Sequence, residues 1–191
     1  MARLVVITGP AASGKTTFTH LLAVRMKAAA LDYDTVGMPL LTAFAEQRGL
    51  PLADACREFR TVCHGTVLGI AAENLRLGQD VLLCAPFGRE IETEGFFRDW
   101  KTAQDVSCEI IECRMQISAE NLAKRVVGRG LARDAGKIGT PLAYARQAIE
   151  RRHSWDPDRV FPIDANTELS GLETQARVVA ADLSASTAQT A

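Results

Sequence analysis

Five short runs of mostly apolar residues recur along the chain, and each has the length and composition of a strand buried on both faces. The runs span residues 4–8, 29–33, 81–85, 107–113 and 160–163. Segments with apolar residues at helical spacing separate them. Since parallel strands need crossover connections that place helices on the faces of the sheet, this alternation predicts an α/β fold with a parallel sheet covered on both sides.

The helical segments carry their own start and stop signals. The first follows residue 14, and two more are predicted at 39–48 and 52–77, where Gly78 stands at a helix-stop position. Within 52–77 one apolar stripe is expected, made of Phe59, Val62, Cys63, Val67 and Ile70. Further on, Ser118 is a candidate N-cap, and Thr140 followed by Pro141 predicts the start of another helix.

The length of 191 residues fits one domain, which we expect to span 1–184. A helical insert at about 38–77 and a basic, glycine-rich lid at about 125–140 are expected within it, and 185–191 is predicted to be a flexible tail because it lacks apolar periodicity.

Composition narrows the class of protein further. Apolar residues make up 47% of the chain and the formal net charge is −1, so no overall basic excess indicates nucleic acid. No apolar run approaches the about 18 residues of a membrane span, and the N-terminal run is too short for a signal peptide, which predicts a cytoplasmic protein. The five cysteines form no CxxC pair and are expected to be buried, reduced thiols.

The stretch GPAASGKT, residues 9–16, is the candidate chemical centre. Its spacing, Gly9-x4-Gly14-Lys15-Thr16, is the P-loop pattern. Glycines let successive N–H groups point at phosphate oxygens, the following helix directs its positive dipole end there, Lys15 would reach the β- and γ-phosphates, and the Thr16 hydroxyl would bind Mg²⁺. The predicted nucleotide-binding residues are Gly9, Ala12, Ser13, Gly14, Lys15, Thr16 and Thr17.

Two classes of P-loop protein do not fit the rest of the chain. A GTPase would carry an Asn-Lys-x-Asp or Thr-Lys-x-Asp motif, and neither is present. The DxxG match at 34–37 lies only one strand and helix after the loop, too early for a GTPase switch. A motor ATPase would need more chain, so the size favours a small kinase.

The combination of GPAASGKT, LDYDTV, GQDVLLCAPFGRE and RVVGRGLARD resembles the small P-loop kinases related to nucleoside monophosphate kinases. Within that group the chain is most similar to the compact AAA-type kinase-like proteins that include chloramphenicol phosphotransferase and zeta toxin. The resemblance covers about residues 3–165. It implies a five-stranded parallel sheet in the order 2-3-1-4-5, ATP and Mg²⁺ as cofactors, and transfer of the γ-phosphate to a small molecule.

The resemblance also implies roles for residues at the ends of the second and third strands. Asp34 would face the acceptor hydroxyl and orient or deprotonate it, and Asp32 competes for this role because alternation places both on the same side of an extended strand. Relatives often have Asp where this chain has Cys84, so either Thr16 and Asp34 suffice for Mg²⁺ or metal binding is weak. Arg89 resembles the arginine that grips the acceptor, although a solvated surface arginine is an equal alternative.

The segment RVVGRG resembles the start of an adenylate kinase lid. By that match Arg125 would cover the adenine, Arg129 would contact the transferring phosphoryl group, and Arg133 and Lys137 are further lid candidates. The alternative is a solvated basic helix face. Binding of RNA is disfavoured because no aromatic residues are interleaved for base stacking.

The leading hypothesis is therefore an ATP- and Mg²⁺-dependent kinase that phosphorylates a hydroxyl of a small metabolite or antibiotic-like molecule. Lys15, Asp34, Arg129 and Arg133 are its predicted catalytic residues, and the insert, with Phe44, Phe59, Arg48 and Arg57, its predicted acceptor region. A nucleoside or nucleotide kinase and a non-catalytic ATP-binding regulatory protein remain alternatives. The expected partner is the small-molecule acceptor, and a homodimer is an open alternative to a monomer.

Overall fold

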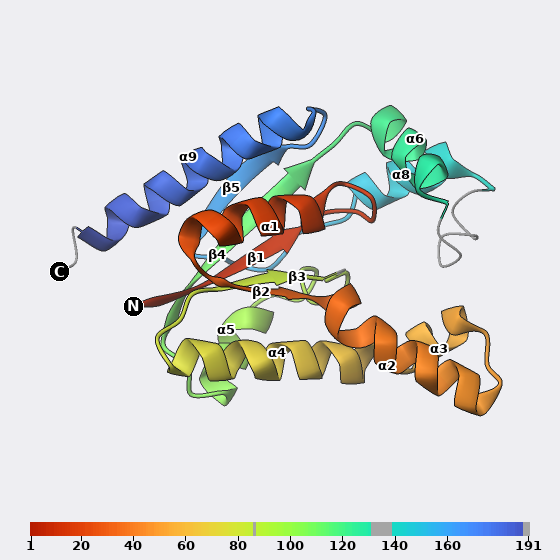
Figure 1. Ribbon diagram of the computed structural model, residues 1–191, viewed down its shortest axis with the longest axis horizontal. Coiled ribbons are helices and arrows are strands. Elements are labelled where there is room, and N and C mark those ends of the chain that lie inside the picture. Colours follow the sequence, from red (N-terminus) through yellow and green to blue (C-terminus); the bar gives the residue numbers. More distant parts are fainter. Residues whose placement is uncertain (86, 131–138, 189–191) are drawn as a thin grey trace.

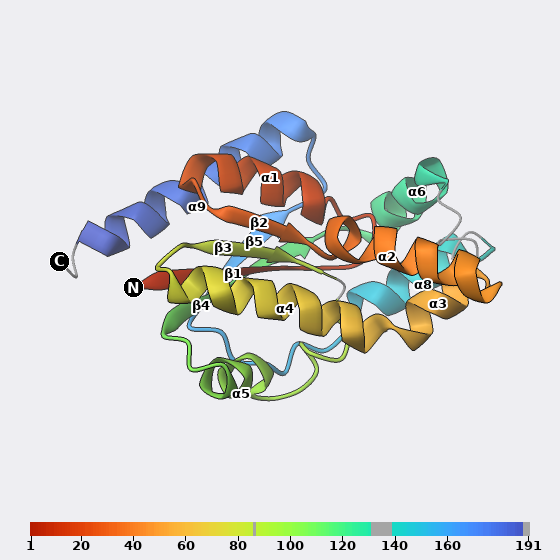
Figure 2. The ribbon, with the colours of Figure 1, turned by 60° about the horizontal axis from the view of Figure 1, so that its bottom comes forward.

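The computed structural model describes residues 1–85, 87–130 and 139–188, and its centre is a parallel sheet with helices on both faces (Figures 1 and 2). The strands are β1 (Ala2–Thr8), β2 (Ala29–Asp32), β3 (Val81–Cys84), β4 (Cys108–Gln116) and β5 (Arg159–Asp164). Their order is β2-β3-β1-β4-β5, which confirms the predicted 2-3-1-4-5 sheet. All five apolar runs form strands, with ends that differ from the predicted ones by up to three residues.

The described helices follow the strands in the alternation that the sequence predicts. They are α1 (Lys15–Met26), α2 (Tyr33–Arg48), α3 (Leu52–Glu58), α4 (Arg60–Arg76), α5 (Phe96–Ala103), α6 (Ala119–Arg129), α8 (Pro141–Ile149) and α9 (Leu169–Ala188). Helices α1 and α9 pack together on one face of the sheet, whereas α2, α4 and α5 lie on the other (Figure 2). None of the helices in the described part of the chain is long and apolar enough to cross a membrane.

Strand β1 shows why both faces of the sheet must be covered. Its apolar residues from Leu4 to Ile7 have no exposed surface. Because side chains alternate along a strand, Leu4 and Val6 join the core on the α4 side, and Val5 and Ile7 join the core on the α1 and α9 side. The P-loop begins directly after the carboxyl end of this central strand. In open α/β folds, ligands bind at this edge of the sheet, where the strand order changes direction.

Helix α2 begins six residues before the predicted start. The chain leaves β2 at Asp32, whose carboxylate accepts a hydrogen bond from the Asp34 N–H at 2.7 Å and caps the helix. The prediction that Asp32 and Asp34 share one side of an extended strand was therefore wrong, because Asp34 lies in the first helical turn. Pro39 lies inside this helix instead of at its start.

The predicted helix 52–77 is divided into α3 and α4 at Phe59. Cys63 and Val67 of the predicted stripe are buried, but Val62 is 63% exposed, and the buried face also includes His64, Ala71 and Ala72. The two small alanines let α4 approach the sheet, and His64 lies against the buried Glu90, so contacts with other elements determine which side of α4 is buried.

The end of the chain also departs from its prediction. Helix α9 continues to Ala188, so residues 185–188 of the predicted tail are helical, and 189–191 lie outside the described residues. The Ser184 and Ser186 hydroxyls donate to carbonyl oxygens one turn earlier, and Arg159 of β5 donates to Ser186. These bonds and the helix propensity of alanine extend the helix without an apolar stripe.

Candidate functional site

The P-loop curls around the start of α1 as its spacing predicts. Gly9 has a φ of 140° and Gly14, the residue before α1, a φ of 97°, both in the left-handed region that favours glycine. A Cβ at Gly9 would lie 2.8 Å from the Cβ of Met115, so the loop also needs glycine there for its approach to β4. Ala12 shares the left-handed conformation, with a φ of 70°.

Lys15 is the cation of this loop. Its Nζ donates hydrogen bonds to the carbonyl oxygens of Gly9, at 3.0 Å, and Pro10, at 2.8 Å. Burial lowers the pKa of Lys15. Ser13 is fully buried, so within the loop Ala12, Gly14, Lys15, Thr16 and Thr17 are the predicted nucleotide-binding residues that line the main cavity.

Thr16 has a carboxylate partner that the sequence pattern does not reveal. Its hydroxyl donates to Oδ2 of Asp32 at 2.7 Å and lies 3.9 Å from the Cys84 sulfur. Asp32 and Cys84 are paired in register on neighbouring strands β2 and β3. A carboxylate therefore lies one strand away from position 84, at Asp32, and contacts Thr16. Burial, with the Asp32 charge, raises the pKa of Cys84 to about 12, so this thiol is neutral.

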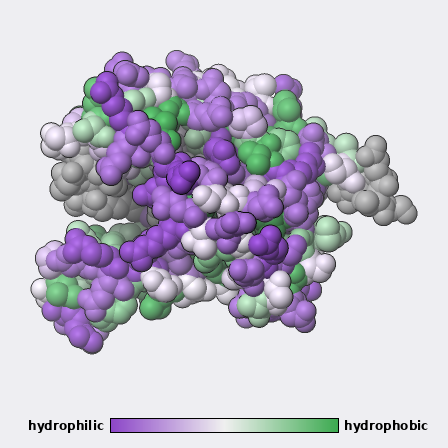
Figure 3. All heavy atoms as spheres, turned by 180° about the vertical axis from the view of Figure 1, so that it is seen from behind, coloured by the Kyte–Doolittle hydropathy of each residue, from purple (hydrophilic) through white to green (hydrophobic). Residues whose placement is uncertain are grey.

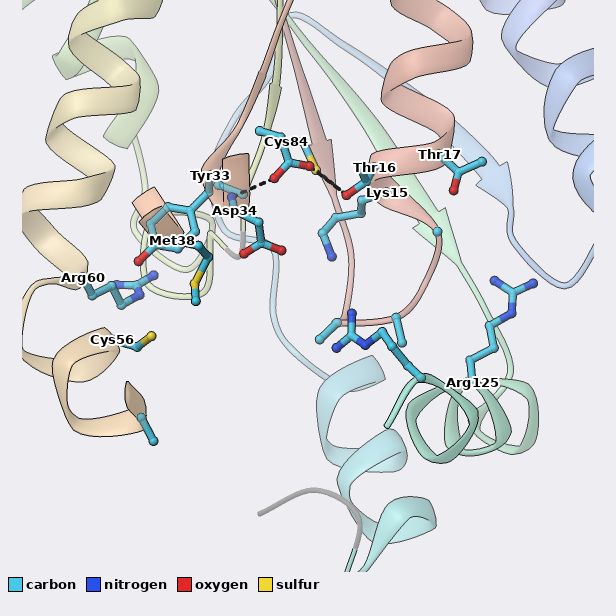
Figure 4. A pocket seen from close by; sticks show the side chains of 17 residues that line it. Lys15, Thr16, Thr17, Tyr33, Asp34, Met38, Cys56, Arg60, Cys84 and Arg125 are labelled. Atoms are coloured by element: carbon cyan, nitrogen blue, oxygen red, sulfur yellow. Dashed lines mark hydrogen bonds between the residues drawn. The ribbon is translucent and has the colours of Figure 1, made fainter. Parts of the chain in front are cut away.

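Asp34 lies beside this group, at the first turn of α2, and lines the same cavity as Lys15 and Thr16 (Figure 4). The cavity has a volume of about 620 Å³. It opens between α2 and α3 on one side and α6 on the other, and the side chains around this opening are mainly hydrophilic when the molecule is seen from behind (Figure 3).

The outer part of the cavity contains one arginine of the insert, Arg60, which the sequence analysis did not single out. Apolar or thiol groups of Met38, Ala53 and Cys56 line the cavity with it. Glu90 holds Arg60 through a 2.8 Å ion pair. Burial raises the pKa of Glu90, but His64 and Arg60 outweigh burial and bring it to about 2, so Glu90 stays charged.

Two predictions for arginines near the acceptor do not match the geometry. Arg89 is exposed and is not among the residues that line the cavity, because its neighbour Glu90 turns inward instead. Arg48 stacks over the ring of Phe44, and Arg57 pairs with Asp54 at the surface. No sequence signal indicates Arg60, because its partner Glu90 lies 30 residues later in the chain.

The described part of the lid reaches the P-loop. Arg125 donates to the carbonyl oxygens of Ser13, Ala165 and Thr167, and so links the loop to the segment after β5. Arg129 lines the main cavity. Arg133 and Lys137 fall outside the described residues.

A second polar group lies beneath the P-loop, around Glu112 of β4. Glu112 has no exposed surface and accepts hydrogen bonds from Thr8, from Arg114 at 2.6 and 3.1 Å, and from His153, whose Nδ1 lies at 2.9 Å. Burial raises the pKa of Glu112, but these three partners outweigh burial and lower it to about 2. Sequence reasoning missed this residue because one glutamate within an apolar strand carries no motif.

We expect this carboxylate to make the protein sensitive to acid. A folded-state pKa near 2, below the ordinary 4.5, contributes stability that is present above pH 4.5 and is lost as the pH falls toward 2. The loss in the free energy of unfolding should be about 2 kcal/mol at pH 3 and about 3 kcal/mol near pH 2. Urea unfolding between pH 7 and pH 3 measures it.

Glu112→Gln is the matched variant for this prediction. It should be less stable at pH 7, because Arg114 and His153 lose their buried partner, and its stability should depend less on pH below 4.5. Glu109→Gln, on the same strand and less buried, is the control. If Glu112→Gln lost as much unfolding free energy below pH 4.5 as the unmodified protein, Glu112 would not be the cause of the acid sensitivity.

Comparison with known proteins agrees with this architecture. The AAA domain family (AAA_33) matches residues 4–151. No curated protein sequence matches the chain. A kinase-like protein from Chloroflexus aurantiacus is 18% identical, with a TM-score of 0.66, and the match covers 92% of this chain and 97% of that one. A gluconokinase from Sinorhizobium meliloti is 16% identical, with a TM-score of 0.59 and coverage of 99% of this chain and 97% of that one. Shikimate kinase from Bacteroides thetaiotaomicron is 15% identical, with a TM-score of 0.58 and coverage of 95% of this chain and 98% of that one.

At these identities the structures establish the fold, and the family match covers most of the chain. The resemblance to small P-loop kinases and the predicted fold class are both confirmed. The chain belongs to the AAA domain family and has the fold of the P-loop kinases.

Proposed function

We propose that this protein is an ATP-dependent kinase that transfers the γ-phosphate of ATP to a hydroxyl group of a small polar molecule. The observation that carries the proposal is the cluster of Lys15, Thr16, Asp32 and Asp34 in one cavity, with the Thr16 hydroxyl 2.7 Å from the Asp32 carboxylate. A hydroxyl next to a carboxylate is a donor set that suits Mg²⁺, which binds through few protein oxygens and the phosphates of a nucleotide. These residues therefore fit ATP together with Mg²⁺.

Each residue has a distinct task in this proposal. Lys15 and the N–H groups at the start of α1 bind the phosphates, and Thr16 and Asp32 would hold Mg²⁺, which neutralises charge on the β- and γ-phosphates. Asp34 orients the acceptor hydroxyl and takes its proton as the oxygen attacks the γ-phosphorus. The bond to the bridging oxygen breaks and ADP leaves with that oxygen. Arg129, and by the lid resemblance Arg133, would stabilise the transferring group.

The acceptor would bind between Asp34 and the outer wall of the cavity. Arg60, held by Glu90, offers a fixed cation there, beside the less polar Met38 and Ala53. This mixture favours an organic acceptor with a negatively charged or strongly polar group. A nucleotide kinase remains the second candidate, because Arg60 could take the role of gripping an acceptor phosphate that the sequence assigned to Arg89.

The direct test is ATP turnover with a panel of hydroxylated acids, sugars, aminoglycoside- and phenicol-type antibiotics, nucleosides and nucleoside monophosphates. We expect ADP release that depends on one class of acceptor and on Mg²⁺. Tight ATP binding without transfer to any acceptor would instead favour the non-catalytic regulatory module.

The Asp32 carboxylate should set the Mg²⁺ requirement. In Asp32→Asn we expect the Mg²⁺ concentration for half-maximal turnover to rise about tenfold or more, because the amide loses the negative charge and keeps only one of the two acceptor oxygens that serve Thr16 and Asp34. Asparagine remains a good N-cap, so α2 should stay folded. Turnover measured against Mg²⁺ concentration gives the shift.

Asp99→Asn, an exposed position in the first turn of α5, removes the same charge away from the cavity and is the control. An Asp32→Asn enzyme with the Mg²⁺ dependence of the unmodified protein would exclude Asp32 from the metal site. In that case a Cys84→Asp variant that gains Mg²⁺ affinity would identify β3 as the place for a carboxylate.

A further inference from the structure

A second cavity, of about 650 Å³, adjoins the phosphate loop and takes no part in the proposed transfer. It shares only Ala11 with the main cavity among the described residues. Its walls come from the first residues of the P-loop, the end of β4, the loop after β3, and α8 with the segment that follows it. We call it the basic cavity, for the charges described next.

The charged side chains that line the basic cavity are all cationic or basic. They are Arg114, Arg151 and His153, and no aspartate or glutamate is among the described lining residues. Gln116 and Gln147 add neutral amide groups. Such a wall offers mainly N–H donors, which suit carboxylate and phosphate oxygens.

Two of these side chains are fixed from behind by Glu112. Arg114 uses Nε and Nη2 for this carboxylate, and His153 uses Nδ1, which leaves Nη1 and Nε2 outside these bonds. Because Glu112 is completely buried, it cannot itself meet a ligand in the cavity. The carboxylate therefore orients the Arg114 donor and fixes the plane of the His153 ring in advance, which lowers the entropic cost of binding an anion.

Arg151 closes the opposite wall by lying across Gly88. A Cβ built on Gly88 would be 2.1 Å from Nη1 of Arg151, so the guanidinium occupies the space that any side chain would need. Glu92 contacts the Nε side at 3.3 Å. Arg151 thus extends from the segment after α8 to the loop after β3, where its guanidinium group lies over Gly88.

Apolar side chains also line the cavity: Ile149 is 41% exposed, whereas Phe87, Ile91 and Ile117 are largely buried. A purely inorganic ion would leave this surface in contact with water. A ligand with both an anionic group and a small hydrocarbon part would use the two halves of the cavity together.

We propose that the basic cavity is a regulatory site for a small organic anion, a carboxylate or phosphate monoester, whose binding changes the affinity of the P-loop for nucleotide. The link is the pair of residues Gly9 and Pro10, which line this cavity and whose carbonyl oxygens accept the two hydrogen bonds from Lys15. Lys15 must exchange these bonds for phosphate oxygens when ATP binds. An anion packed against Gly9 and Pro10 changes the free energy of that exchange, and by linkage ATP changes the affinity for the anion equally.

Amide NMR of the protein saturated with Mg²⁺ and the non-hydrolysable ATP analogue AMPPNP tests the site, with citrate and inorganic phosphate as the probes. We expect saturable shifts at Gly88, Gln116 and Gln147. A response to citrate alone assigns a carboxylate ligand, and a response to phosphate alone a phosphate ester. Lys15 and Thr16 report the nucleotide separately, so failure of AMPPNP to bind would count against the proposed kinase and leave the anion test readable.

Matched variants test which residues bind the probe. Arg151→Gln should weaken probe binding about tenfold, whereas Arg152→Gln, the exposed neighbour that does not line the cavity, should leave it unchanged. Gly88→Ala should weaken binding similarly without removing a charge, because its methyl group displaces the flexible guanidinium.

The coupling is measured as the AMPPNP dissociation constant with and without saturating citrate. We expect a change of about fivefold that Arg151→Gln abolishes. Shifts confined to Lys15 and Thr16, no shift at all, or equal effects of Arg151→Gln and Arg152→Gln would overturn the site. A dissociation constant that citrate leaves unchanged would overturn its regulatory role.

Discussion

Asp34→Asn should lower the rate of phosphoryl transfer by about 10² to 10⁴-fold while nucleotide affinity stays within about twofold of the unmodified protein. Asparagine can still contact the acceptor hydroxyl, but it cannot take a proton or stabilise the developing positive charge on the attacking oxygen. Asp34 lines the acceptor part of the cavity, whereas the Thr16 hydroxyl bonds to Asp32, so metal and nucleotide binding should persist. Turnover rates and a separate titration with AMPPNP measure the two effects.

The pairing of Asp34→Asn with Asp32→Asn separates two carboxylates that lie two residues apart. Loss of transfer with a normal Mg²⁺ requirement in the first variant, and a raised Mg²⁺ requirement in the second, would assign the acceptor and metal roles as proposed. The assignment would be reversed if the two variants exchanged these effects. If Asp34→Asn transferred phosphate at the unmodified rate, Asp34 would have no part in the chemistry.

Lys15→Ala should reduce transfer at least 100-fold and weaken ATP binding, because it removes the charge that faces the β- and γ-phosphates. The fold should survive, since Nζ of Lys15 donates its hydrogen bonds to the carbonyl oxygens of Gly9 and Pro10, within the P-loop itself. Calorimetric titration with ATP and the thermal unfolding midpoint measure the two quantities.

Lys124→Ala, an exposed lysine on α6, is the control for loss of one positive charge. It should bind and use ATP normally. Retention of ATP-dependent transfer in Lys15→Ala would contradict the whole proposal for the P-loop, whereas loss of binding together with a large drop in unfolding temperature would show that Lys15 serves the fold instead.

The strand pattern and the P-loop could be predicted from the sequence because both depend on local order. A run such as LVVI must be buried on both faces, and Gly9, Gly14, Lys15 and Thr16 stand at fixed spacing within one turn between a strand and a helix. The parallel class of the sheet follows from the alternation of these runs with helices, and its strand order came from the family resemblance.

The acceptor side was harder to predict because its residues come from separate elements. Arg60 of α4 is held at the cavity by an ion pair with Glu90, which lies 30 residues later in the chain. No periodicity in either segment indicates that contact. Arg89 had the right position in a motif, but its side chain is exposed. The start of α2 was placed at Pro39 because proline is common in the first turn of helices. The helix instead begins at Tyr33, because Asp32 caps it there.

The sequence by itself determined that this chain folds as an α/β protein around a phosphate-binding loop, since local spacing and hydrophobic periodicity are sufficient for both. Only the tertiary structure decided which carboxylate lies beside Thr16, the one that we propose binds Mg²⁺. The sequence shows a cysteine at position 84 and suggests a weakened site, but parallel pairing brings Asp32 beside Cys84 and within 2.7 Å of the Thr16 hydroxyl. Register between strands whose paired residues lie 52 positions apart along the chain depends on the packing of the whole sheet, and no local pattern encodes it.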